Sequence, residues 1–492
     1  MKSLPFVIPF LLLLSACGRH FDPKKTFTVE ETKADYTLMR QALEEAHPGL
    51  TRYTSPDSMK LIFDQIEQKL DHNMSEREFR RVINPVFAFV RCGHTDVYPS
   101  KGYARYFKKN KPKEFPITPY WAQNKLLIWQ NRSNDSTLKA GTEIVRLDGR
   151  PVAEIIADIR LMIPSDGYNQ TYKNVLINNS FGSFYRYLYG NNDTFKMTVK
   201  DSTGQTKSLV LSFNKPIKVT KKLVPVLPNL APVPAPALPK SAAPEPRLSK
   251  ADLRRNLRFS GKDSSVAILD INTFKDKNYA AFYRRTFRKL QKKGTKNLVI
   301  DLRNNGGGRS SASIKLMSYL LDSNYVVYKQ VDAPVAKPSF NRHLGWKFIR
   351  LGVRYFDSKR TPTGGLLNRA TGKTHQPAKR NHFNGKVFVI TNGGSFSASA
   401  IFASIVQQHG RAKTIGRETG GGRNGCNAFV SPMLTLPHTQ VRVRMPMFKI
   451  VLDIPTLDIG HGVMPDYPVE FTFNDANKGR DLDMEKALEL IK

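Results

Sequence analysis

A serine lies where a buried strand gives way to a helix in the C-terminal third of the chain. Residues 387–390 are apolar, Gly393 and Gly394 follow, and apolar side chains recur at helical spacing after Ser397. Glycines permit a sharp turn, and the first N–H groups of a helix have no partner within it. Those donors could stabilise an oxyanion on a carbonyl that Ser397 attacks. The pattern predicts acyl-transfer chemistry at Ser397, with a plain N-cap serine as the alternative.

A second glycine-rich loop follows another strand-like run upstream. The apolar stretch 298–302 leads into Asn304, Asn305, and three consecutive glycines at 306–308. Because glycine lets the backbone approach a ligand closely, Gly306 or Gly307 is a candidate second oxyanion donor beside the N–H of Ala398. A phosphate-binding loop is the rival interpretation, but no Lys-Ser or Lys-Thr pair follows the glycines.

Four motifs in this chain resemble those of the tail-specific, or C-terminal processing, serine peptidases and their relatives with a tricorn-type core. The resemblance spans most of residues 28–492 and implies a serine peptidase with Ser397 as nucleophile, in place of Ser395 or Ser399. We expect no metal, because the cysteines and histidines lack ligand spacing, and no other cofactor. The four motifs are Cys92–Gly–His94–Thr–Asp96, Asp301 to Gly308, Ser395–Phe–Ser397–Ala–Ser399, and Gly460–His–Gly–Val–Met–Pro465–Asp466.

The chain departs from the processing-protease branch at the general base. That branch uses a lysine downstream of the serine, and the corresponding position here is Gly422. The neighbouring Arg423 cannot replace it, because a guanidinium stays protonated at any useful pH. The tricorn-type branch uses an N-terminal histidine, which His94 matches, and an imidazole titrates near neutrality. His94 is therefore the expected base, with His461 as a lesser competitor.

The acid that would orient His94 is the least defined member of the expected site. The tricorn-type pattern places it just before the terminal glycine motif, where this chain has Asp458. Asp96 and Glu418 are alternatives. Because the family lysine is missing, a catalytically inactive relative that only binds peptides or envelope partners is a second functional hypothesis.

The 492 residues are too many for one ordinary core, so several domains are expected. We expect an α/β (α+β multidomain) fold whose catalytic part is the ClpP/crotonase-like α/β sandwich that the resemblance implies. The segment 140–152 looks like the Ile-x-x-Leu-Asp-Gly hairpin of a PDZ-type domain, with a plain hairpin as the alternative. The expected units are a signal peptide (1–16), an N-terminal helical region carrying His94 (28–112), a PDZ-like substrate-binding domain (113–215), a Pro-rich linker or insertion (216–261), and the catalytic domain (262–492).

The N-terminus predicts export and a lipid anchor. Met1–Lys2 precedes an apolar stretch and then Leu14–Ser–Ala–Cys17, which is typical of bacterial lipoproteins cleaved before an acylated cysteine. We therefore expect Cys17 to carry lipid and the protein to lie on the periplasmic face of the envelope, as an outer-membrane lipoprotein. The net charge of +36 is spread along the chain without a nucleic-acid motif, which favours anionic envelope surfaces over nucleic acid as a partner. The expected substrates are peptides or unfolded proteins, and the sequence does not define an oligomeric state.

Two further cysteines flank the expected site. Cys92 lies two residues before His94, and Cys426 follows the nucleophile helix. In an oxidising compartment this predicts a Cys92–Cys426 disulfide, with two separate buried thiols as the alternative. Cys92 as nucleophile and a Cys/His metal site are lesser alternatives, since no metal-ligand spacing is evident.

Overall fold

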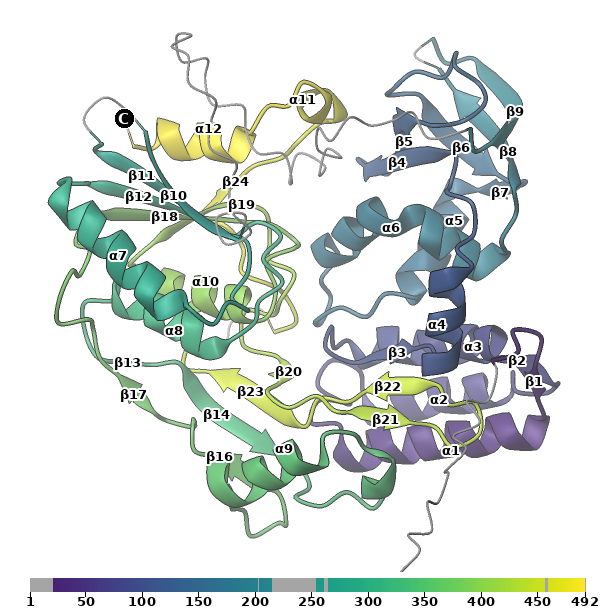
Figure 1. The fold of residues 1–492 in the computed structure, drawn as a ribbon, viewed down its shortest axis with the longest axis horizontal. Coiled ribbons are helices and arrows are strands. Elements are labelled where there is room, and N and C mark those ends of the chain that lie inside the picture. Colours follow the sequence, from purple (N-terminus) through teal and green to yellow (C-terminus); the bar gives the residue numbers. More distant parts are fainter. Residues whose placement is uncertain (1–20, 202, 215–253, 261–263, 456–458, 492) are drawn as a thin grey trace, which may run out of the picture.

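A computed structural model describes residues 21–201, 203–214, 254–260, 264–455 and 459–491. The predicted signal peptide, Cys17, Asp458 and most of the Pro-rich segment lie outside these residues. The described chain contains helices and several sheets around separate hydrophobic cores, which confirms the predicted multidomain α/β fold (Figure 1). Every helix in this part of the chain is too short or too polar to span a bilayer.

Four helices build the N-terminal region, and short polar side chains start each of them. Thr28 and Glu31 form a capping box at the first, and the side chains of Ser55, Ser75 and Ser100 accept backbone N–H groups at the other three. Buried aromatic and aliphatic side chains of the first three helices form one core, and the short antiparallel pair of β1 and β2 adds Met74 to it. The elements are α1 (Val29–Ala46), α2 (Pro56–Glu67), α3 (Glu76–Val90), α4 (Lys101–Lys109), β1 (Thr26–Phe27) and β2 (Met74–Ser75).

An antiparallel sheet with two helices follows, and it has a hydrophobic core of its own. The predicted hairpin at Asp148 and Gly149 is confirmed, because both residues have positive φ (48° and 80°) between paired strands, as a tight hairpin turn requires. The strands run in the order β4-β5-β6-β8-β9, and β7 pairs with β6. The elements are β4 (Ile117–Ala122), β5 (Lys125–Asn131), β6 (Glu143–Leu147), β7 (Arg150–Pro151), α5 (Val152–Leu161), α6 (Thr171–Tyr189), β8 (Thr194–Lys200) and β9 (Thr206–Ser212).

A six-stranded sheet forms the centre of the C-terminal part, in the order β10-β11-β12-β18-β19-β24. All neighbours from β11 to β24 are parallel, and β10 pairs antiparallel at the edge, so the predicted linker ends before Arg255. Alternate side chains along the strands face α7, α8 and α10 on one side and α12 on the other (Figure 1). The elements are β10 (Arg255–Ser260), β11 (Val266–Ile271), β12 (Asn297–Asp301), β18 (Lys386–Thr391), β19 (Lys413–Gly416), β24 (Tyr467–Pro468), α7 (Tyr279–Lys292), α8 (Ser310–Ser318), α10 (Ala398–Gln408), α11 (Phe473–Asn477) and α12 (Leu482–Glu489).

A second, five-stranded sheet packs below these helices and shares their core. It has the order β15-β16-β14-β23-β20, and a short pair, β13 with β17, lies beside it. Layered packing of helices between sheets buries both faces of the central strands, which explains why those strands are almost entirely apolar. The elements are β13 (Tyr325–Val326), β14 (Tyr328–Ala333), β15 (Ser358–Arg360), β16 (Leu366–Asn368), β17 (Thr374–His375), β20 (Asn427–Ala428) and β23 (Phe448–Leu452).

A small three-stranded sheet joins the N-terminal region to the C-terminal part. Strand β22 (Arg442–Arg444) pairs with β21 (Met433–Thr435) on one side and with β3 (Asp96–Tyr98) on the other. Side chains from β21 and β22 enter the core of the N-terminal helices. In addition, the buried carboxylate of Asp35 on α1 accepts the N–H groups of His438 and Thr439 (3.0 and 2.8 Å). The N-terminal region is therefore completed by strands from the C-terminal part.

Candidate functional site

Ser397 is the accessible serine of the three that follow β18. Ser395 and Ser399 are fully buried, whereas Ser397 is partly exposed. The Ser395 hydroxyl already makes two hydrogen bonds within the fold: it donates to the carbonyl of Leu302 (2.8 Å) and accepts the N–H of Asn392 (3.1 Å). Of the three hydroxyls, only that of Ser397 can therefore meet a substrate.

The backbone of Ser397 is strained. It has φ 56° and ψ −120° at the first residue before α10, a conformation that costs a non-glycine residue about 1–3 kcal/mol. Its hydroxyl makes no capping hydrogen bond to the helix. The structure therefore does not favour the plain N-cap alternative, and the sharp turn instead presents the side chain at the start of the helix.

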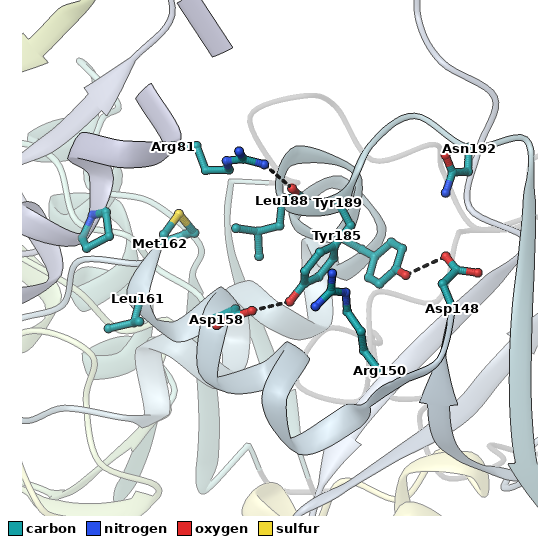
Figure 2. A pocket seen from close by; sticks show the side chains of 11 residues that line it. Arg81, Asp148, Arg150, Asp158, Leu161, Met162, Tyr185, Leu188, Tyr189 and Asn192 are labelled. Carbon is teal, nitrogen blue, oxygen red and sulfur yellow. Dashed lines mark hydrogen bonds between the residues drawn. The ribbon is translucent and has the colours of Figure 1, made fainter. Parts of the chain in front are cut away.

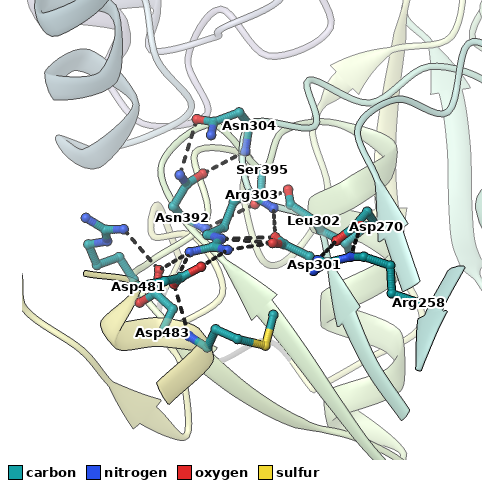
Figure 3. A network of polar contacts seen from close by, with 12 residues as sticks. Arg258, Asp270, Asp301, Leu302, Arg303, Asn304, Asn392, Ser395, Asp481 and Asp483 are labelled. Atoms are coloured by element: carbon teal, nitrogen blue, oxygen red, sulfur yellow. Dashed lines mark hydrogen bonds and ion pairs between the residues drawn. The ribbon is translucent and has the colours of Figure 1, made fainter. Parts of the chain in front are cut away.

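Two loops that follow adjacent parallel strands are fastened together around this turn (Figure 3). The side-chain oxygen of Asn392 accepts the N–H groups of Asn304 and Gly394 (3.0 and 2.9 Å). The N–H of Phe396 donates to the carbonyl of Asn305 (3.0 Å). The position of Ser397 relative to the triple-glycine loop is consequently set by backbone and amide hydrogen bonds.

A buried arginine anchors the glycine loop at its start. The guanidinium of Arg303 contacts the carboxylates of Asp301 (2.6 Å), Asp481 (2.6 Å) and Asp483 (3.2 Å), as Figure 3 shows. The charges of these carboxylates keep the pKa of Arg303 well above its usual value despite burial. Removing one member of such a buried network leaves uncompensated charge, so the loop geometry is tightly constrained.

The oxyanion candidates lie beside the serine. A Cβ added at Gly307, which has φ +88°, would come within 2.8 Å of Ser397 Cβ and 2.9 Å of the Ala398 nitrogen. The N–H of Gly307 already donates to the side chain of Asn305 (3.0 Å). Gly306 is exposed, and space is open around it. This favours the N–H groups of Gly306 and Ala398 as the donors, with Gly307 supplying the close approach.

His94 reaches the site on the turn between α3 and β3. Arg444 of β22 donates to the carbonyls of His94 (2.6 Å) and Gly93 (3.1 Å), which holds that turn. The imidazole packs on the ring of Phe396, the residue before Ser397, with centroids 4.7 Å apart. Burial, together with the charge of Arg444, lowers the pKa of His94 to about 3. The ring is therefore neutral at physiological pH, as a general base must be.

Asp166, which belongs to no motif in the sequence, lies beside His94 in the structure. This buried residue lies in the loop between α5 and α6, and its two oxygens accept the N–H groups of Gly93 (2.8 Å) and Gly422 (3.2 Å). Burial raises the pKa of Asp166 to about 6, while the two N–H donors oppose that shift. Its carboxylate ties the base-bearing turn to the position where the processing-protease branch has lysine.

Cys92, His94 and Asp166 form a compact cluster, in which Cys92 and Asp166 are buried and His94 is partly buried. One ligand atom of each, a thiol sulfur, a ring nitrogen and a carboxylate oxygen, lies within 4.8 Å of the others. The Nδ1 atom of His94 is buried and has no hydrogen-bond partner among the described residues. These donor types would also suit a zinc-like cation, which spacing along the sequence did not indicate. Because both Asp166 oxygens already accept N–H groups, we assign the carboxylate to holding the turn and facing the imidazole.

The other expected acids and bases have partners of their own or lie outside the described chain. Glu418 accepts the N–H of Gly462 (2.8 Å) and lies 3.6 Å from Nδ1 of His461, so these two residues pair with each other. Asp96 accepts the N–H of Val97 (2.8 Å) beside Arg444, and burial raises its pKa to about 6. Asp458 is outside the described residues and stays a prediction.

The predicted Cys92–Cys426 disulfide is absent from the structure, in which both cysteines are free, buried thiols. The Cys92 thiol donates to the carbonyl of Asn427 (3.9 Å). Burial and the nearby Asp166 carboxylate raise the pKa of both thiols, so both stay protonated and unreactive. The alternative of two separate buried thiols therefore describes this structure.

A large pocket lies away from this site, between α3 and the antiparallel β-rich unit (Figure 2). Its volume is about 600 Å³, and neither Ser397 nor His94 lines it. Two tyrosine hydroxyls in it donate to carboxylates, Tyr185 to Asp148 (2.7 Å) and Tyr189 to Asp158 (2.6 Å). The pocket is therefore a recess with both polar and apolar lining near the predicted substrate-binding unit, and it is separate from the candidate catalytic residues.

The state of the thiols gives a testable prediction. In the native protein, Cys92 and Cys426 should resist alkylation, because both are buried and protonated, and both should react after denaturation without reductant. Mass spectrometry of digests alkylated before and after denaturation measures this. A Cys92–Cys426 linked peptide in the unreduced digest would contradict the free-thiol arrangement.

Comparison with known proteins agrees with this geometry. Residues 265–469 match the model of peptidase family S41. A probable CtpA-like serine protease of Staphylococcus haemolyticus is 26% identical over 167 residues, which is 34% of this chain and 27% of that protein. The chain thus matches about a quarter of that relative's length. The crystal structure of mature CPAF shares the fold, with a TM-score of 0.64 at 14% identity over 94% of this chain and 96% of that one. Residues 265–469, which carry Ser397 and the triple-glycine loop, are therefore the part of the chain that is similar to peptidase family S41.

Proposed function

We propose that this protein is a serine endopeptidase that hydrolyses peptide bonds in peptides or loosely folded proteins through an acyl-enzyme on Ser397. The observation that carries the proposal is the strained, partly exposed Ser397 at the start of α10, next to the glycine loop and to the ring stack of His94 and Phe396. A serine kept in such a conformation by two fastened loops is typical of a nucleophile.

The proposed reaction has two halves. The Ser397 oxygen attacks the carbonyl carbon while the imidazole of His94 accepts the hydroxyl proton, and the N–H groups of Gly306 and Ala398 stabilise the oxyanion. His94 then gives the proton to the leaving amine as the carbon–nitrogen bond breaks. His94 next takes a proton from a water molecule, whose oxygen attacks the acyl carbon. The ester bond to the Ser397 oxygen then breaks, and His94 returns the proton to that oxygen as the acid product leaves. Asp166 positions the base-bearing turn throughout.

The β-rich unit is the proposed place of substrate capture. Its hairpin, its separate core and the recess along α5 and α6 support this role. Charged and aromatic side chains in that recess, such as Arg150 stacked on Tyr189 (4.8 Å), suit a peptide with both polar and apolar groups. The proposed location is the periplasmic face of the envelope, with lipid on Cys17, and it rests on the N-terminal sequence pattern alone.

The nucleophile can be tested without a known substrate. Ser397→Ala should abolish labelling by a fluorophosphonate probe and hydrolysis of casein, because the neighbouring hydroxyls of Ser395 and Ser399 are buried. Ser399→Ala is the matched control, since its buried hydroxyl has no partner in the described chain and its loss should leave labelling unchanged. Labelling that survives in Ser397→Ala would refute the nucleophile assignment, and wild-type protein that never labels would favour an inactive binding protein.

Two adjacent glycines give a second test. Gly307→Ala should reduce the labelling rate severely, because its Cβ would come within 2.9 Å of the Ala398 nitrogen and its φ of +88° is strained for alanine. Gly306→Ala keeps the backbone N–H and meets nothing within 4 Å, so it should label at nearly the wild-type rate. Equal rates for the two variants would place the oxyanion site elsewhere.

The pH dependence distinguishes two carboxylates with similar pKa values. Above about pH 6, Asp166 is ionised and accepts both N–H groups; below it, protonation weakens that clamp, so labelling should fall as pH decreases through about 6. His94 stays neutral over this range because its pKa is near 3. Asp166→Asn should lower the labelling rate above pH 6 and remove the fall in rate below it, whereas Asp96→Asn should keep that fall. The opposite pattern would assign the fall in labelling rate to Asp96.

A further inference from the structure

Large apolar side chains are exposed together in one short segment that the proposed chemistry does not use. Helix α9 (Lys347–Gly352) and the π-helical turn η2 (Val353–Asp357) lie at the edge of the lower sheet (Figure 1). A soluble surface rarely keeps so many apolar side chains in one place. The exposed side chains and their exposed fractions are Trp346 (52%), Phe348 (84%), Ile349 (54%), Leu351 (37%), Tyr355 (61%) and Phe356 (72%).

The segment is fastened to the fold at both ends. The N–H of Gly345 donates to the carbonyl of Met433 (2.9 Å), and Arg350 donates to the carbonyls of Gly345 (2.9 Å) and Leu344 (3.2 Å). Val353 packs against the main core, and β15 continues from η2 into the sheet. The aromatic side chains are therefore displayed by a built element of the fold.

Basic residues are interleaved with these aromatic ones. Residues 346–360 contain five lysines and arginines and a single acid, Asp357. Lys347, Lys359 and Arg360 are exposed, and the guanidinium of Arg354 stacks on Tyr355 (5.0 Å). The face thus combines apolar area with positive charge.

Apolar area combined with positive charge favours one of three possible partners: a second copy of the chain, the Pro-rich segment, or an anionic bilayer. A second copy of the chain would bring two positive faces together in a symmetric contact, which repulsion opposes. The Pro-rich segment 215–253 also carries more lysines and arginines than acids, so it offers no complementary charge. An anionic bilayer supplies both needs, because tryptophan and tyrosine favour the headgroup region and each basic residue near an anionic surface gains about 1 kcal/mol.

We propose that residues 346–360 form a membrane-contacting face that places Trp346, Phe348 and Phe356 in the headgroup region of an anionic bilayer. The proposal goes beyond the peptidase function and depends neither on Ser397 chemistry nor on acylation of Cys17. A lipid anchor would tether the chain near the bilayer, whereas this face would orient it against the surface.

Trp346 serves as the probe, since the chain has only two other tryptophans, Trp121 and Trp129. The full chain, carrying Ser397→Ala to prevent self-digestion, is added to phosphatidylglycerol vesicles that contain lipids with brominated acyl chains. Trp346 fluorescence, taken as the difference from a Trp346→Phe variant, should be quenched by these lipids and shielded from acrylamide. Phosphatidylcholine vesicles should give much less quenching. A Trp346 that stays open to acrylamide on phosphatidylglycerol vesicles overturns the proposal, even if an anchor binds the chain.

Variants and vesicle-free samples distinguish a bilayer from the two other partners, a second copy of the chain and a segment of the same chain. Phe348→Ser with Phe356→Ser should reduce the quenching of Trp346, whereas Val210→Ser, on the distant strand β9 and 64% exposed, should not. An equal loss of quenching in the double variant and in Val210→Ser would overturn the proposal. Without vesicles, shielding of Trp346 from acrylamide that rises with protein concentration would indicate a second copy of the chain and would also overturn it. Shielding in the dilute, vesicle-free protein would show that the chain itself covers the face, and it overturns the proposal too.

Discussion

The pairing of β3 with β22 is the contact on which the candidate site depends. His94 belongs to the N-terminal helices and Ser397 to the C-terminal sheet, so no local structure can place one beside the other. The pairing of Asp96 with Arg444, together with the Arg444 hydrogen bonds to the carbonyls of Gly93 and His94, positions the base-bearing turn. Because small errors in such placement lower rates strongly, the small joining sheet has a functional role out of proportion to its size.

Buried charges make that placement rigid. Arg303, with its three carboxylates, anchors the glycine loop, and Asp166 holds Gly93 and Gly422 with its two oxygens. Each charged group lies where water cannot replace a lost partner, so a displaced loop would leave an unpaired charge. The N–H groups near Ser397 are thereby oriented before a substrate binds, which is the arrangement that stabilises a developing oxyanion most effectively.

Sequence reasoning failed where contacts join distant segments. Asp166 follows no motif, because its role comes from two backbone N–H groups that are far away in the chain. Cys92 lies close in sequence to His94, and Cys426 follows the nucleophile helix, which predicts a disulfide between them. The structure instead has two free, buried thiols near the Asp166 carboxylate. The predicted linker runs to residue 261, but in the structure β10 already begins at Arg255, because it pairs with β11, a strand that comes after it.

The sequence by itself determined the strand-turn-helix around Ser397, the triple-glycine loop, the Asp148–Gly149 hairpin and the general α/β class. These features follow from hydrophobic periodicity, glycine conformations and short polar motifs, all of which act over a few residues. Only the tertiary structure decided which of three serines is accessible, which acid lies at His94, and that the aromatic and basic side chains of residues 346–360 are left uncovered by the described chain. Accessibility, burial and charge pairing depend on packing between segments far apart in the chain, and local sequence patterns do not encode that packing.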